Sequence, residues 1–148
     1  CANTLHYYAD DLQKQILKPI IHIASATADE IKRKGLSKVG LLGTKMTMEE
    51  DFYKNRLSNS QILTLIPNEP ERAFIQRTIL NELLKNIFLE KTKAQFLQII
   101  SSLQQQGVEG IVLGCTEIPL LIKQSDVEIP VFNTLEIHVN AFVDFALE

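Results

Sequence analysis

The stretch GIVLGCTEIP at residues 110–119 decides the fold class of this chain. It opens with an apolar run between two glycines, which predicts a short buried β-strand over residues 110–113. Cys115, Thr116 and Glu117 follow directly, where the chain is expected to turn into the next helix. Ligands bind at the carboxyl ends of parallel strands in α/β proteins. The stretch therefore predicts an α/β fold that presents a thiol at the carboxyl edge of a sheet.

Strands and helices are predicted to alternate along the rest of the chain. Apolar runs predict strands at residues 20–23, 38–42, 61–66, 110–113 and 129–132. Periodic patterns and end signals predict helices at residues 7–18, 26–34, 48–57, 69–86, 90–106, 118–123 and 135–147. The strands are continuously apolar and do not alternate with polar residues, which is typical of a parallel sheet with helices on both faces.

Composition excludes several classes of protein. The 148 residues suffice for a real core, and a net charge of −3 offers no basic surface to nucleic acid. No apolar run reaches membrane-spanning length, so no membrane partner is expected. Cys1 and Cys115, 114 positions apart, and three scattered histidines form neither a disulfide framework nor a zinc motif. We expect a protein of the reducing cytoplasm that binds no metal.

Cys115, Thr116 and Glu117 are the first candidates for chemistry. Backbone N–H groups at the start of a helix stabilise an anion, either a thiolate or a substrate carboxylate. The Thr116 hydroxyl can donate to an oxygen, and the Glu117 carboxylate can orient the thiol or take its proton. The alternative is a buried cysteine that only fills space at the end of a strand.

Two more polar clusters follow predicted turns. Thr44 and Thr47, with Lys45 between them, come after the apolar run at 38–42, where hydroxyl and N–H groups suit a carboxylate or a phosphate. The alternative is that Thr47 only caps the following helix. The pattern of a phosphate-binding P-loop is absent. Asn3 and Thr4 form the other cluster near the start of the chain.

Four segments, taken together and in this order, resemble the aspartate/glutamate racemase family, and most closely the branch with the broad-specificity enterobacterial enzyme. They are ANTLH at residues 2–6, VGLLGTKMTMEEDFY at 39–53, EPERA at 69–73 and LGCTEI at 113–118. The second segment is the most specific of the four. No single short motif identifies the family, but the ordered set covers nearly the whole chain.

The resemblance implies two α/β domains related by a pseudo-twofold axis, with the active site between them, and a homodimer. On this interpretation residues 1–24 are a remnant of the first domain and residues 25–128 form the second. Residues 129–148 return to the first domain as a strand and a helix. The chain starts with cysteine and not methionine, so we expect most of the first domain to precede Cys1.

The chemistry that the resemblance implies is racemisation of an amino acid without a cofactor. A base removes the Cα proton on one face, and an acid returns a proton on the other. Cys115 matches one of the two proton-transferring residues of the family, and Glu117 matches a supporting group. Substrate-anchoring positions are matched by Asn3, Thr4, Thr44, Thr47 and Thr116.

The second proton-transferring residue departs from the family pattern. The family has a cysteine directly before Asn-Thr, whereas this chain has Ala2 there and Cys1 one residue earlier. In extended chain, a shift of one residue turns a side chain to the opposite face. Three possibilities stay open: a water molecule or a neighbouring group serves as the second acid, Cys1 takes the role, or racemisation is weak or lost.

Two further functions stay open beside the racemase. One is an isomerase or decarboxylase of the same superfamily that acts on a maleate, hydantoin or arylmalonate type of substrate. The other is a degenerate protein that binds a small carboxylate without turnover, an alternative favoured by Ala2.

Overall fold

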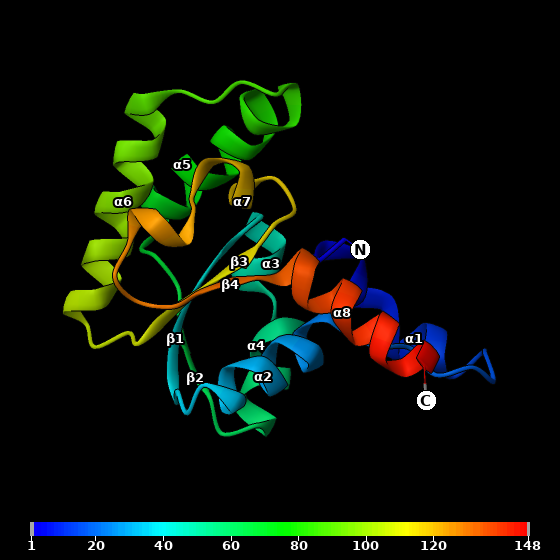
Figure 1. Ribbon diagram of the computed structural model, residues 1–148. Coiled ribbons are helices and arrows are strands. Elements are labelled where there is room, and N and C mark those ends of the chain that lie inside the picture. The colour runs from blue at the N-terminus through cyan, green and yellow to red at the C-terminus, as the bar shows by residue number, and fades with distance from the viewer. Residues whose placement is uncertain (1, 148) are drawn as a thin grey trace.

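A computed structural model describes residues 2–147 and shows an α/β fold (Figure 1). Four parallel strands form one sheet in the order β2-β1-β3-β4. They are β1 (Lys38–Gly43), β2 (Leu63–Leu65), β3 (Gly110–Gly114) and β4 (Val131–Asn133). The predicted fold class is therefore confirmed. Since β4 pairs with β3, the final segment of the chain starts within this same sheet.

Helices cover both faces of the sheet, as expected for continuously apolar strands (Figure 1). On one face, α5 (Glu69–Asn81), α6 (Glu90–Gln105) and α7 (Ile118–Leu121) pack on the side chains of Leu42, Ile111 and Leu113. On the other face, α2 (Ile23–Arg33) and α4 (Asp51–Asn59) pack on Val39, Leu41, Val112 and Phe132. Successive strand residues thus alternate between two cores, and both cores are apolar. None of the helices within residues 2–147 is long and apolar enough to cross a bilayer.

Several helix ends follow from local sequence. Gly35 and Gly107 end α2 and α6 with φ of +73° and +84°, a conformation in which a Cβ is disfavoured. Asn68 caps α5 in a reciprocal pair of hydrogen bonds with Glu71, and Pro70 lies in the first turn. The predicted helix at 69–86 is shorter than expected, because α5 ends at Asn81 and a 3-10 turn, η2 (Leu83–Lys85), follows. The predicted helix at 118–123 likewise ends at Leu121, and the short η3 (Gln124–Asp126) leads towards β4.

The predictions for the N-terminal segment were wrong in two places. The expected helix at 7–18 is replaced by a 3-10 turn, η1 (Thr4–Tyr8), and one short helix, α1 (Ala9–Gln13). The expected strand at 20–23 does not form, since Ile23 already begins α2 and the His22 side chain caps that helix. An apolar run of four residues does not distinguish a strand from the approach to a buried helix.

The predicted helix at 48–57 is in fact two helices. α3 (Lys45–Glu49) begins earlier than expected, because Thr44 and not Thr47 is its cap and accepts from the Thr47 N–H at 3.3 Å. Glu50 is extended, with ψ of 157°, and separates α3 from α4. Glu49 therefore ends α3, and Glu50 precedes the first turn of α4.

The last helix, α8 (Thr134–Leu147), packs along α2 and holds the N-terminal segment in place (Figure 1). The His138 Nε2–H donates to the Ile21 carbonyl at 2.7 Å, because a carbonyl can only accept. The rings of His22 and His138 lie 4.8 and 5.1 Å from the ring of His6, between centroids. Three histidines that are scattered in the sequence therefore meet in the fold. Within residues 2–147, no group of three such side chains is arranged to hold a metal ion.

Because His22 and His138 are buried in their neutral form, we expect the fold to lose stability in acid. Burial, followed by the positive charges of Arg56 and His6, lowers the pKa of His22 to about 4, and burial also lowers the pKa of His138. Protonation of His22 Nδ1 would break its hydrogen bond with the Ala24 N–H. A depressed pKa means that the unfolded chain binds the proton first, so stability is complete above pH ~6.5 and falls towards pH ~4.

Urea unfolding at pH 7 and pH 4.5 measures this effect. We expect a loss of about 2 to 3 kcal/mol from His22. The His22→Asn variant keeps an oxygen that can cap α2 and cannot titrate, so its stability should depend less steeply on pH. An equal loss in the variant and the parent chain would contradict the assignment to His22.

Candidate active site

Three strand ends bring the candidate residues to one edge of the sheet. Gly43 at the end of β1 pairs with Gly114 at the end of β3, and Asn133 at the end of β4 pairs with Leu113. Thr44, Cys115 and Thr134 follow these strands directly. The carboxyl edge of a parallel sheet is where α/β proteins bind ligands. The position predicted for the Cys115 loop is therefore the position observed.

Cys115, Thr116 and Glu117 form one hydrogen-bonded group. The Cys115 Sγ–H donates to Glu117 Oε2 at 3.0 Å, and the Thr116 hydroxyl donates to Glu117 Oε1 at 2.7 Å. Cys115 is only 6% exposed, whereas Thr116 and Glu117 are half-buried. One carboxylate, that of Glu117, thus accepts hydrogen bonds from both the thiol and the Thr116 hydroxyl.

The thiol of Cys115 is held in its protonated form. Burial raises its pKa to about 12, and the hydrogen-bonded Glu117 carboxylate acts in the same direction. The backbone N–H groups of Glu117 and Ile118 favour the thiolate, as expected at the start of a helix, but their effect is smaller. The residue therefore rests as a thiol, and the thiolate is a minor form.

Replacing Glu117 with glutamine is expected to lower the pKa of Cys115 by about one unit or more, because the negative charge beside the sulfur is removed. The ultraviolet absorbance of the thiolate as a function of pH measures the change, in a Cys1→Ser background so that one thiol titrates. Glu128→Gln, on an exposed residue, makes the same change of charge elsewhere. A Cys115 pKa that stays at the parent value would contradict the role of Glu117.

Three threonine hydroxyls form the second group at this edge. Thr4 Oγ1 lies 3.0 Å from Thr44 Oγ1 and 3.4 Å from Thr47 Oγ1, and the last two atoms lie 3.0 Å apart. Thr47 is fully buried, and its methyl group packs beside Gly114, the residue before the thiol. The structure therefore brings together three of the predicted anchoring residues, from two distant parts of the chain, next to the Cys115 loop.

A cavity of about 420 Å³ opens beside these hydroxyls. It is lined by Thr4, Thr44, Lys45, Met46, Glu49, Glu50 and Gln76. Its volume lies in the range of pockets that bind small molecules. Arg72 pairs with Glu49 at 2.9 Å, between Nε and Oε1, so one of the two acidic side chains at the cavity is neutralised.

Asn3 and Thr4 contact opposite sides of the strand that carries Cys115. Thr4 contacts Thr44 after β1, and the Asn3 amide donates to Thr134 Oγ1 after β4 at 3.0 Å, while β3 lies between those two strands. Sequence reasoning did not find Thr134, because its partner is 131 positions away and no local pattern marks it. Cys1, the other predicted proton-transferring residue, lies outside the described residues.

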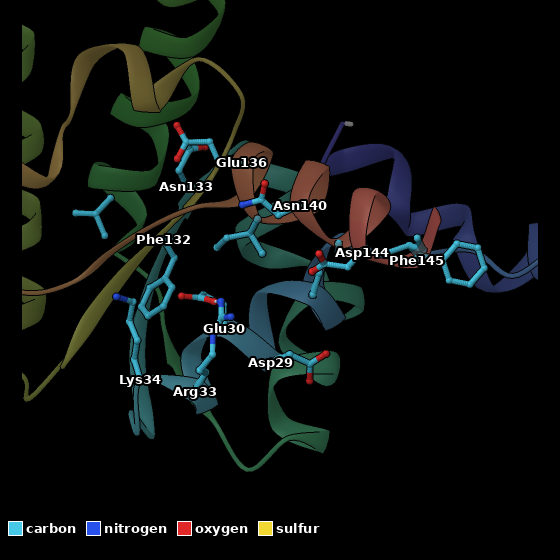
Figure 2. A pocket seen from close by; sticks show the side chains of 15 residues that line it. Asp29, Glu30, Arg33, Lys34, Phe132, Asn133, Glu136, Asn140, Asp144 and Phe145 are labelled. Carbon is cyan, nitrogen blue, oxygen red and sulfur yellow. The ribbon is translucent and has the colours of Figure 1, made fainter. Parts of the chain in front are cut away.

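A second cavity lies elsewhere and is lined by none of the predicted site residues. It measures about 650 Å³ and lies between α2 and α8 (Figure 2). Figure 2 shows Asp29, Glu30 and Arg33 of α2 and Asn140 and Asp144 of α8 among the side chains that line it. Acidic and basic side chains are mixed there, without a nucleophile. The smaller cavity beside the threonines is lined by two of the predicted anchoring residues, Thr4 and Thr44, whereas Cys115, Thr116 and Glu117 are not among its lining residues.

Comparison with known proteins shows the family. The family model of Asp/Glu/Hydantoin racemase matches residues 1–142. The crystal structure of an Asp/Glu racemase candidate from Yersinia pestis is 43% identical and covers the whole chain, with a TM-score of 0.95. An aspartate racemase homologue from Pyrococcus horikoshii OT3 is 40% identical over 99% of the chain, with a TM-score of 0.89. This chain spans 65% of each of those two structures.

A curated relative adds a similarity of sequence. A glutamate racemase from Carnobacterium sp. (strain St2) is 26% identical over 112 residues, which are 75% of this chain and 40% of that protein. The match to the family model extends over nearly all of the chain, and the same fold recurs in the two solved structures. The chain therefore belongs to the Asp/Glu/hydantoin racemase family.

Proposed function

We propose that the protein containing this chain racemises an amino acid, with aspartate and glutamate as the first substrates to test, through proton transfer at Cα by Cys115. One observation supports the proposal. The Cys115 thiol, directly after β3, donates to Glu117 at 3.0 Å, and the hydroxyls of Thr44 and Thr47 follow the neighbouring strand β1. A proton-transferring pair beside donors suited to a carboxylate is what this chemistry requires.

The proposed steps follow from these contacts. The substrate carboxylate is held by the hydroxyls of Thr4 and Thr44, and by that of Thr116 once it turns from Glu117 to the substrate. These donors stabilise the negative charge that develops as the Cα proton leaves. Cys115 must lose its proton before it can act as a base, and the hydrogen-bonded Glu117 carboxylate is the neighbouring group that can take that proton. Because the pKa of the thiol is raised, only a small fraction of the protein holds the thiolate that takes the Cα proton. A thiolate whose conjugate thiol has a raised pKa is a stronger base, which suits a weakly acidic C–H bond. In the reverse direction the thiol returns a proton to the carbanion.

Ala2 affects the second half of the reaction, in which a proton returns to Cα on the face opposite to Cys115. An alanine side chain cannot transfer a proton, so a water molecule, a neighbouring group or Cys1 must supply it for inversion to occur. We expect Ala2→Cys, which places a thiol directly before Asn3, to raise the rate of inversion about 100-fold. Ala2→Ser is the matched control with a much weaker acid, and equal rates in the two variants would contradict this account.

The experiment that tests the function is NMR of α-proton exchange in D₂O, with the full gene product and each enantiomer of aspartate and glutamate separately. Exchange with inversion from both enantiomers is the expected result. Exchange of one enantiomer with little inversion would show that Cys115 works without a second acid. No exchange with any amino acid would overturn the proposal.

The two alternative functions, a related isomerase or decarboxylase and a binding protein, differ from the racemase in their substrate or in the absence of turnover. An isomerase or decarboxylase of the superfamily would convert a maleate, hydantoin or arylmalonate type of substrate and leave amino acids unchanged. A binding protein would give heat on titration with a small carboxylate and no exchange. The homodimer, the absence of a cofactor, the cytoplasmic location and the division at residues 24 and 128 are further parts of the proposal.

A further inference from the structure

The position of the threonine group depends on α3, a helix that is too short to be stable alone. It has five residues, Thr47 lies within it, and Thr44 is its cap. Isolated helices of fewer than about 12 residues are marginal in water, so contacts with the rest of the fold must hold α3 in place. Those contacts therefore decide where the hydroxyls of Thr44 and Thr47 lie.

Two side chains of α5 hold the two ends of α3. At its first residue, Gln76 Oε1 accepts from the backbone N–H of Lys45 at 2.7 Å. This bond is shorter than the 3.3 Å bond through which the Thr44 hydroxyl caps the helix. At its last residue, Arg72 Nε donates to Glu49 Oε1 at 2.9 Å. Arg72 and Gln76 are four positions apart, so they lie on one face of α5.

Arg72 is itself held in a fixed orientation. Its Nη1 donates to the Pro67 carbonyl at 2.7 Å, and only 19% of its side chain is exposed. Two hydrogen bonds from one planar guanidinium group fix its direction. The Lys45 ammonium is a weaker partner for Glu49, since it lies 3.9 Å from Oε2 and its side chain is 67% exposed. Arg72 is therefore the side chain that fixes the end of α3.

We propose that Arg72 and Gln76 are positioning residues, which hold α3 at both ends so that the Thr44 hydroxyl stays beside the Cys115 loop. Thr44 and Cys115 directly follow paired residues of β1 and β3, so they leave the sheet side by side. A shift of α3 would move the anchoring hydroxyl away from the thiol. The inference rests on the proposed function and deepens it, because it identifies what holds the carboxylate-binding hydroxyl in place.

A double-mutant cycle with Thr44→Val tests the proposal in the full gene product. We expect Gln76→Leu and Arg72→Met each to raise KM for aspartate at least fivefold, with a smaller change in kcat. In the Thr44→Val background the anchoring hydroxyl is absent, so the same two changes should alter KM less than twofold. Arg77→Met, on an exposed residue of the same helix, is the matched control and should leave KM unchanged. An unchanged KM in the two variants, or an equal rise in both backgrounds, would overturn the proposal.

Amide hydrogen exchange measures the hold on α3 without turnover. The amides of Met48 and Glu50 donate hydrogen bonds along α3. In Gln76→Leu and in Arg72→Met they should exchange at least tenfold faster than in the parent protein, whereas the amides of β3 should keep the parent rate. Unchanged exchange in α3, or an equal rise along β3, would overturn the assignment. Failure of the proposed function is seen separately, as an absence of α-proton exchange in the parent protein.

Discussion

Replacing Cys115 with serine is expected to abolish exchange of the α-proton, with a fall in rate of about a thousandfold or more. A serine hydroxyl at the same position is a weaker acid than the thiol, so the anion that would take the Cα proton forms far less often. Serine keeps a donor for the Glu117 oxygen at 3.0 Å and fills nearly the same volume, so the fold should be preserved. The loss would then report on proton transfer and not on structure.

The measurement is the rate of deuterium incorporation at Cα, with thermal unfolding as a check that the variant remains folded. Cys1→Ser is the informative comparison, since it removes the other thiol of the chain. A loss in that variant too would assign Cys1 the second role. Exchange by Cys115→Ser within tenfold of the parent rate would contradict the proposed chemistry.

Replacing Gly43 with alanine is expected to lower the free energy of unfolding by about 3 kcal/mol or more. A Cβ at this position would lie 2.7 Å from the backbone oxygen of Gly114 on the neighbouring strand. Backbone of a paired strand cannot move aside without separating β1 from β3. Since Thr44 and Cys115 follow these two glycines, the change should also disturb the site.

Gly40→Ala, on the same strand, is the matched control for urea unfolding. Its Cβ would lie 2.8 Å from Ile111 Cδ1 and 3.0 Å from Leu103 Cδ1, which are the ends of flexible side chains. Those ends can rotate away, so we expect a loss of only about 1 to 2 kcal/mol. Equal losses in the two variants would contradict the view that contact between strand backbones makes Gly43 necessary.

The sequence predicts the strands at the centre of the sheet well, and the physical reason is their burial. Residues 39–42 and 110–113 are continuous apolar runs that are followed by glycine, and both are buried on two faces. The run at 20–23 is also mostly apolar, but it does not lie in the sheet, because Ile23 already begins the buried helix α2. The amphipathic pattern at 7–18 fails for another reason: Tyr8 and Leu12 stay exposed, so little packing stabilises a longer helix.

Some residues of the candidate site can be found from a local motif, whereas others are placed only by contacts between distant parts of the chain. Cys115, Thr116 and Glu117 are adjacent in sequence, and their hydrogen bonds are local, so a motif is enough to find them. Thr134 and His138 carry no such motif, because their partners Asn3 and Ile21 lie more than a hundred positions away. Contacts of that kind depend on the order of the strands, which periodicity does not specify.

The hydrogen bond between Asn3 and Thr134 determines how late in the synthesis of the chain the candidate site can form. It joins two residues 131 positions apart, one near the start of the described chain and one at the start of its last helix. Domains fold during synthesis from the N-terminus onwards. Asn3 therefore leaves the ribosome long before its partner exists, and the pocket can take its final shape only after α8 has emerged. A nascent chain should bind no substrate until α8 has left the ribosome.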